Sequence, residues 1–200
     1  MPIKAIYVDF GGVILTTTSP QPRSTLAAEF GMTESEMVRF VFNCETASLA
    51  SLGKISEEDH WLDVTRRLKL PASEMPRIRD TFFGGDELNQ DLLQLLRSLR
   101  KTHKIGLISN GWDGLRSWIT AHQIDDVFDR MTISCEVGIT KPDARIYQIA
   151  LANFSVNPAE AIFVDDTEKN VTACLALGMH GILFQNSQQV IKDIHRLLVM

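Results

Sequence analysis

Short runs of apolar residues, many of them β-branched or aromatic, recur along the chain and predict the strands of a buried sheet. The first such run occupies residues 3–8 and ends at a polar residue followed closely by two glycines. Further runs occupy 105–108, 131–133, 161–164 and 181–184, and each ends near a polar or glycine-containing turn. Strands that are apolar on both faces are typical of a parallel sheet covered by helices on both sides.

Helical patterns separate these apolar runs, at 92–99, 112–122, 143–153, 168–177 and 190–199. Strands that alternate with helices predict an α/β fold, a doubly wound parallel sheet with a Rossmann-like core.

Between about residues 21 and 85 the alternation stops, and helical patterns alone occur, at 24–30, 34–42, 56–68 and 74–82. Ser56 followed by three acidic residues is a good helix start, because a serine accepts from free backbone N–H groups and acids suit the helix dipole. The sequence therefore predicts an α-helical cap domain over 19–86, inserted into a core built from 1–18 and 87–200.

The amino-acid composition excludes several classes of protein but does not identify a binding partner. Hydrophobic residues make up 44% of the chain, enough for a large core, and the net charge of -5 gives no general attraction to nucleic acid or to anionic membranes. No apolar stretch reaches the roughly 18 residues of a membrane span, and no signal-peptide pattern opens the chain. Cys44, Cys135 and Cys174 are too scattered for a disulfide framework or a zinc site. We expect a cytoplasmic protein, monomer or homodimer, with no nucleic-acid or membrane partner.

Polar side chains follow three of the predicted strands at the edge where open α/β sheets bind ligands. Asp9 follows the first run, Ser109 and Asn110 follow the second, and Asp165 and Asp166 follow the fourth. We expect these side chains to form one site.

These residue types suit phosphoryl transfer to a carboxylate. Asp9 is ionised at neutral pH and can attack phosphorus, giving an aspartyl-phosphate that water then breaks. A carboxylate and a phosphate repel, so a divalent cation must bridge them, and Mg²⁺ prefers carboxylates, phosphate oxygens and water. Asp166 supplies a second carboxylate, and the carbonyl of Gly11 can approach the metal because glycine has no side chain. Ser109 and nearby N–H groups would hold the phosphoryl oxygens, while Lys141, just ahead of a helix, balances the transition-state charge.

Four segments resemble, in order, the four signature motifs of the haloacid dehalogenase superfamily: 7–13, 108–110, 141–142 and 163–166. The resemblance covers the whole chain. It implies a magnesium-dependent hydrolase of a small phosphorylated metabolite, with Asp9 and Lys141 catalytic, Ser109, Asn110 and Lys141 binding the substrate, and a helical cap that closes over the site.

The resemblance also indicates the metal ligands. Asp9, Gly11 and Asp166 correspond to the family's metal site, and Asp165, where many members have glycine, is a further candidate. Asn170 stands where many members carry another acid, and we expect its amide to orient the groups around the metal.

The chain departs from typical phosphatases of this family at Gly11. Those phosphatases carry a second aspartate at this position, which protonates the leaving group and then activates water. Its loss should slow the hydrolysis of alkyl phosphates by about 10² to 10⁴. We therefore expect a leaving group that needs little protonation, as in a sugar-1-phosphate or an acyl phosphate, and sugar-phosphate phosphatases with this glycine are known in the family.

Two alternatives remain open. In a metal-free 2-haloacid dehalogenase, Asp9 would attack carbon and a halide would leave without an acid, but the pair of Asp165 and Asp166 would then have no purpose. In a non-catalytic binding protein of the same fold, Gly11 would be a relic of lost chemistry, but the joint presence of Asp9, Lys141 and Asp166 argues against it.

Residues outside the motifs are candidates for substrate contacts. Phe10 and Trp112 lie close enough in sequence to the first two motifs to line the site. Arg39 and Arg66 lie on predicted cap helices, from which an arginine can reach a substrate anion when a cap closes. The histidines show no metal-ligand spacing and receive no role.

Overall fold

A five-stranded parallel sheet forms the centre of the computed structural model, which describes residues 2–199. Its strands are β1 (Ala5–Val8), β4 (Lys104–Ser109), β5 (Arg130–Ile133), β6 (Ala161–Asp165) and β7 (His180–Leu183). The order across the sheet is β5-β4-β1-β6-β7. From β1 the chain moves outward to β4 and β5, then returns to β6 on the other side, so the strand order reverses at β1. Ligands bind at such a reversal point in open α/β sheets.

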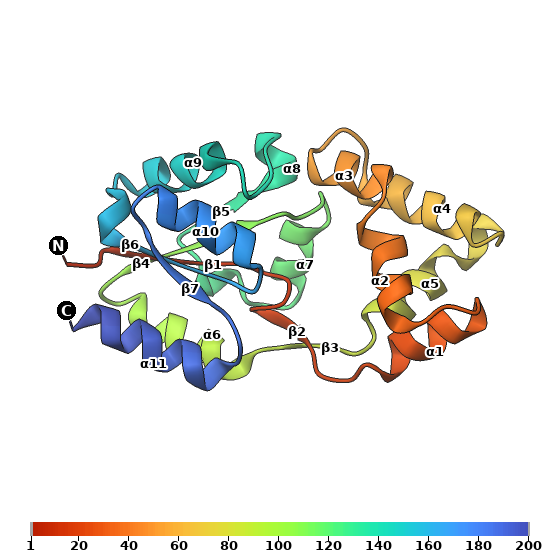
Figure 1. The fold of residues 1–200 in the computed structure, drawn as a ribbon, viewed down its shortest axis with the longest axis horizontal. Coiled ribbons are helices and arrows are strands. Elements are labelled where there is room, and N and C mark those ends of the chain that lie inside the picture. Colours follow the sequence, from red (N-terminus) through yellow and green to blue (C-terminus); the bar gives the residue numbers. More distant parts are fainter. Residues whose placement is uncertain (1, 200) are drawn as a thin grey trace.

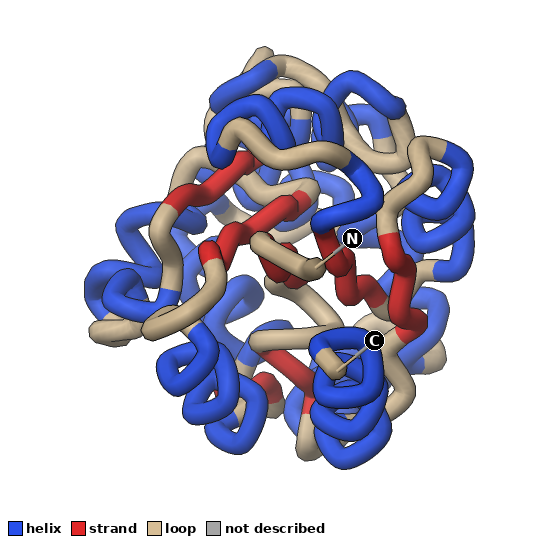
Figure 2. The backbone as a smooth tube through the Cα atoms, turned by 90° about the vertical axis from the view of Figure 1, so that its left-hand side faces the viewer, coloured by secondary structure: helices blue, strands red, loops and turns tan. Residues whose placement is uncertain are grey.

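Helices cover both faces of this sheet (Figures 1 and 2), which confirms the predicted doubly wound α/β fold. On one face lie α6 (Gln90–Leu99), α7 (Leu115–Ala121) and α11 (Ser187–Leu198), packed through residues such as Leu93 and Ile194. On the other face lie α9 (Ala144–Phe154) and α10 (Glu168–Ala176), packed through Tyr147 and Cys174. The shorter elements of the core are α8 (Ser134–Val137) and the 3-10 turns η2 (Asp125–Val127) and η3 (Pro158–Glu160).

One helix of the core begins later than its sequence pattern predicts. The pattern extends over 112–122, but α7 begins at Leu115 and Gly114 stands at its N-cap. Glycine is a poor residue for a helix interior, so Gly111 and Gly114 favour a loop before the helix. Trp112 and Asp113 therefore lie in a loop that extends toward the cap.

Five helices and a 3-10 turn form a second cluster beyond the carboxyl end of β1 (Figure 1). They are α1 (Gln21–Glu29), α2 (Glu34–Phe42), α3 (Glu45–Ser51), α4 (Glu57–Arg67), η1 (Ala72–Glu74) and α5 (Met75–Phe83). The cluster has its own core, in which Leu26, Met37, Trp61 and Phe82 are completely buried. Ser56 caps α4 as predicted, its hydroxyl accepting from the backbone N–H of Asp59 at 3.0 Å. The sequence patterns did not reveal α3.

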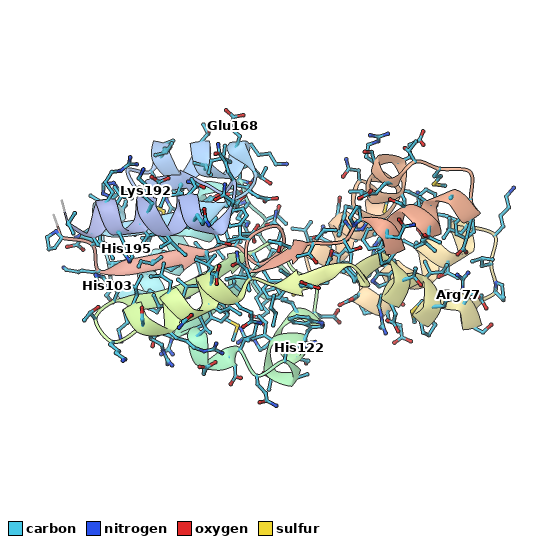
Figure 3. The ribbon with its side chains drawn as sticks, turned by 90° about the horizontal axis from the view of Figure 1, so that it is seen from below. Arg77, His103, His122, Glu168, Lys192 and His195 are labelled. Atoms are coloured by element: carbon cyan, nitrogen blue, oxygen red, sulfur yellow. The ribbon has the colours of Figure 1, made fainter. Side chains whose placement is uncertain are left out.

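Two antiparallel strands join the core to the cap, β2 (Leu15–Thr17) and β3 (Asp86–Leu88). Figure 3 shows this ribbon from below, between the sheet and the helical cluster that carries Arg77. Arg23 of α1 donates to the carbonyl of Phe82 at 3.1 Å and pairs with Asp86 of β3 at 3.1 Å, with both side chains of the pair nearly buried. This buried pair fixes the first cap helix to the ribbon.

Among residues 2–199, no helix combines the length and the hydrophobicity needed to cross a bilayer.

Candidate active site

Asp9 lies directly after the central strand, at the reversal point of the sheet. Its N–H donates to the carbonyl of Val164 on β6 at 2.9 Å, which continues the strand pairing to this residue. Its carboxylate oxygen Oδ1 accepts from the N–H of Phe10 at 2.7 Å and lies 2.8 Å from the Lys141 ammonium. Both contacts use the same oxygen, so within residues 2–199 Oδ2 has no protein donor and can meet a ligand.

Lys141 is buried between two carboxylates. Its ammonium lies 2.8 Å from Asp9 and 2.6 Å from Asp165, and only 1% of its side chain is exposed. Asn110 holds the backbone of this lysine, accepting from its N–H at 2.7 Å and donating to its carbonyl at 3.0 Å. The Asn110 amide, a predicted substrate contact, therefore positions Lys141, and its backbone N–H is the group left for a phosphoryl oxygen.

Asp165 is completely buried and holds Lys141 from the other side. Its oxygens also accept from the N–H of Thr167 at 2.8 Å and from the amide of Asn170 at 3.0 and 3.1 Å. These donors contact both oxygens of Asp165, which is also a predicted metal ligand. Asn170 likewise contacts Asp165 in this structure, and its own Oδ1 is buried without a partner among the described residues.

The side chain of Asp166 is exposed and completes an acidic group. Carboxylate oxygens of Asp9, Asp165 and Asp166 all lie within 4.8 Å of one another. Gly12 makes room for this arrangement, because it has a φ of +78° and a Cβ there would lie 2.2 Å from Asp166 Oδ2. At Gly11, by contrast, a Cβ would meet no atom within 4 Å.

Within residues 2–199, Lys141 is the one cationic side chain paired with these three acids. Burial raises the pKa of Asp9 from 3.8 to about 6, against the lowering effect of the Lys141 ammonium, and the charge of Asp165 raises it further. Partial desolvation at the edge of the site, followed by the charge of Asp165, also raises the pKa of Asp166, although its side chain reaches the surface. Crowded carboxylates of this kind disfavour their own ionisation unless a cation compensates them. The site therefore suits a hard divalent cation with oxygen ligands.

The remaining substrate candidates lie in different parts of the structure. Ser109 ends β4, next to β1, and is buried at the carboxyl edge of the sheet. Phe10 belongs to the sheet core, packed edge-on against Trp118 with ring centroids 5.4 Å apart. Arg66 pairs with Asp63 of its own helix, while Arg39 is exposed on α2.

The loop after Ser109 contacts the cap through Trp112 and Asp113. The indole N–H of Trp112 donates to the Ser51 hydroxyl at 3.2 Å, and Asp113 accepts from the N–H of Glu57 at 2.8 Å. Asp113 thereby adds a second acceptor at the start of α4. No sequence signal joins these residues, because each contact spans more than fifty positions.

Solved structures share this fold. A predicted haloacid dehalogenase-like hydrolase from Porphyromonas gingivalis is 23% identical with a TM-score of 0.77, and each chain is covered completely. A haloacid dehalogenase family enzyme from Bacteroides thetaiotaomicron, in complex with magnesium and inorganic phosphate, is 19% identical with a TM-score of 0.74, and the match covers 92% of this chain and 94% of that one.

Curated relatives include phosphatases that match over nearly the whole chain. A sesquiterpene phosphatase from Aspergillus oryzae is 27% identical, covering 98% of this chain and 96% of its own length. A D-ribitol-5-phosphate phosphatase from Bacteroides thetaiotaomicron is also 27% identical, covering 92% and 93%. Other relatives are much longer: the chain spans 7% of mouse acyl-CoA dehydrogenase family member 10, with 41% identity over 71 residues.

The model of the haloacid dehalogenase-like hydrolase family matches residues 3–178, which include all four motifs. Relatives named as phosphatases accompany this match, so the reading as a non-catalytic protein is set aside. The chain therefore belongs to the haloacid dehalogenase-like hydrolases.

Proposed function

We propose that this hydrolase is a magnesium-dependent phosphatase that hydrolyses a small phosphorylated metabolite through an aspartyl-phosphate on Asp9. The observation that carries the proposal is the buried Lys141 ammonium, 2.8 Å from Asp9 and 2.6 Å from Asp165, beside the exposed carboxylate of Asp166. The lysine keeps Asp9 ionised and oriented, as a nucleophile requires.

In the proposed reaction, Asp9 attacks phosphorus with one carboxylate oxygen and the ester oxygen leaves. Lys141 balances the negative charge that gathers on the phosphoryl oxygens, and the Ser109 hydroxyl and the Asn110 N–H donate to those oxygens. Water then attacks phosphorus in the aspartyl-phosphate, which releases phosphate and restores Asp9.

Asp9, Asp166 and the carbonyl of Gly11 would hold Mg²⁺, with Asp165 next to them. When bound, the ion supplies the positive charge that lets a phosphate dianion approach the acidic group. Its fit rests on the donor set, oxygen ligands only, and on the imbalance between three carboxylates and one lysine.

The glycine at position 11 limits which leaving groups the enzyme can release. Nothing at this position can protonate the departing oxygen, so we propose a weakly basic leaving group, such as the anomeric oxygen of a sugar-1-phosphate or the carboxylate of an acyl phosphate. The relatives named for ribitol-5-phosphate and sesquiterpene phosphates differ widely in the group attached to phosphate. The choice of substrate must therefore come from residues of this chain.

We also propose that the enzyme works in the cytoplasm, as a monomer or homodimer, with Cys44, Cys135 and Cys174 as free thiols. The three thiols are unpaired in the structure.

The testing experiment measures phosphate release from acetyl phosphate, sugar-1-phosphates, sugar-6-phosphates and nucleotides, with and without Mg²⁺, for wild type and Asp9→Asn. Turnover that requires Mg²⁺ and disappears in Asp9→Asn is expected. The metal-free dehalogenase remains the second candidate because Gly11 permits it. Magnesium-independent release of halide from a 2-haloacid, without phosphate release from the panel, would replace the proposal.

A further inference from the structure

Phe42 of the cap exposes part of its aromatic ring next to Trp112, a residue of the core loop that follows Ser109. We infer that Phe42, supported by Trp112, contacts the leaving group of the substrate and selects phosphate esters whose leaving group carries an apolar ring or chain. The inference rests on the proposed phosphatase reaction and adds its substrate class.

Large exposed hydrophobic side chains are few in this protein. Among residues 2–199 they are Phe42 at 42%, Leu175 at 52%, Leu183 at 37% and Val199 at 85% exposure. Leu175 lies on α10, Leu183 lies on β7 and Val199 follows α11, all in the core domain. Phe42 is the one member of this set that belongs to the cap.

Phe42 lies on the face of α2 that does not enter the core of the cap. Met37 and Val41 are completely buried in the cap, whereas Ser35, Arg39 and Phe42 follow one another at helical spacing on the opposite face. In Figure 1, α2 stands between the carboxyl end of β1 and the helices α4 and α5.

The Phe42 ring packs against two other aromatic rings. Its centroid lies 5.5 Å from that of Phe82 and 5.8 Å from that of Trp112, both at the edge-on or tilted angles that aromatic pairs prefer. Trp112 is itself fixed by its hydrogen bond to Ser51 at 3.2 Å. The Phe42 ring thus packs on aromatic neighbours with one part of its surface and leaves the rest exposed as an apolar surface.

Trp112 links this surface to the loop of the proposed phosphate site. Trp112 is the third residue after Ser109 and the second after Asn110, whose amide holds Lys141. A phosphoryl group bound at Ser109 would place its ester oxygen and attached group on the cap side of the sheet, where α2 lies. An apolar group there would remove the exposed face of Phe42 from water, which favours binding in proportion to the area covered.

The exposed Phe42 ring and the absence of an acid at Gly11 together limit the class of substrate. Among phosphates with weakly basic leaving groups, those with an apolar substituent, such as aryl phosphates, rank above those that carry only hydroxyl groups. Binding energy from the apolar group also offsets part of the missing acid catalysis, because contacts remote from the reacting bond can lower its barrier.

The test compares kcat/KM of wild type, Phe42→Ala and Phe42→Leu with Mg²⁺ on two substrates, 1-naphthyl phosphate and acetyl phosphate. Both have weakly basic leaving groups, but acetate is too small to reach the cap. Phe42→Ala should lower kcat/KM about tenfold for 1-naphthyl phosphate and less than about twofold for acetyl phosphate. Phe42→Leu, which keeps an apolar side chain, should recover most of the loss. Leu175→Ala, a similarly exposed hydrophobic residue outside the site, should change neither substrate.

If Phe42→Ala lowers kcat/KM equally for both substrates, Phe42 has a structural role and the inference is wrong. If Phe42→Ala leaves kcat/KM unchanged for both substrates, the inference is also wrong. Failure of the proposed function gives a different result: wild type would then release no phosphate from acetyl phosphate, or Asp9→Asn would release it equally, and the inference would fall with it.

Discussion

Replacing Lys141 by methionine removes a cation that is buried with the acidic group. The lysine side chain is 1% exposed and its two partners, Asp9 and Asp165, are 12% and 0% exposed, so water cannot take its place. Breaking a buried ion pair by removing one partner typically costs about 3–5 kcal/mol, because the other charge is left uncompensated. We expect Lys141→Met to lower the free energy of unfolding by about this amount at neutral pH without Mg²⁺.

The second effect of the substitution is on Asp9. Lys141 is the main group that lowers the pKa of Asp9 against the effect of burial, so its loss should raise that pKa above about 6. The fraction of ionised nucleophile at neutral pH then falls, and the charge on the transferring phosphoryl group loses its partner. Loss of one such stabilising group costs about 10² to 10³ in kcat.

The assay is urea unfolding followed by tryptophan fluorescence, for wild type, Lys141→Met and the double variant Lys141→Met with Asp165→Asn. If uncompensated charge causes the instability, the double variant should be more stable than Lys141→Met by more than about 1 kcal/mol, since it buries one carboxylate fewer. A loss below about 1 kcal/mol in Lys141→Met, or a double variant less stable than the single one, would refute the reasoning.

Three further predictions concern glycines and a histidine. Gly11→Asp fits, because a Cβ there meets no atom within 4 Å, and it should raise kcat for an alkyl phosphate at least about tenfold; an unchanged rate in a folded variant would contradict the role assigned to this position. Gly12→Ala should raise the Mg²⁺ concentration needed for half-maximal activity about tenfold or more, because its Cβ would lie 2.2 Å from Asp166. Gly11→Ala, the control, should leave that concentration unchanged. Equal values for both variants would argue against Asp166 as a ligand. Burial lowers the pKa of His60 from 6.5 to about 4, so the unfolded chain takes up a proton first as the pH falls. The contribution of His60 to stability, which is fully present above pH 6.5, should therefore decrease by about 2 kcal/mol between about pH 7.5 and about pH 5. The raised pKa of Asp9 acts in the opposite direction in both proteins, so the test is the difference: wild type should lose about 2 kcal/mol more than His60→Gln in the same unfolding titrations, and equal losses would exclude His60 as the cause.

The sequence predicts most of the sheet, because its signals are local. Apolar runs mark the buried strands, and the rule that ligands bind at the carboxyl ends of the strands selects Asp9, Ser109 and Asp166 without coordinates. The Ser56 cap is equally local, since serine and its hydrogen-bond partner Asp59 are three residues apart.

Local sequence signals cannot predict contacts between segments that are far apart in the sequence. The hydrogen bond from the Asn110 amide to the backbone of Lys141 joins residues 31 positions apart. No sequence pattern distinguishes an amide that holds a lysine backbone from one that binds phosphate. The ribbon of β2 and β3 consists of three-residue strands that become stable only when paired with each other. Trp112 shows a further limit, because its helical pattern is overridden by flanking glycines and by the aromatic core of the cap.

The most direct test of the central proposal, that Asp9 carries the phosphoryl group with the help of Mg²⁺, is ¹⁹F NMR of the protein with beryllofluoride, a phosphoryl mimic that attaches to a competent aspartate. The proposal predicts a bound fluoride resonance for wild type that requires Mg²⁺ and is absent in a folded Asp9→Asn variant. A resonance that persists in Asp9→Asn, or its absence in wild type with Mg²⁺, would contradict it.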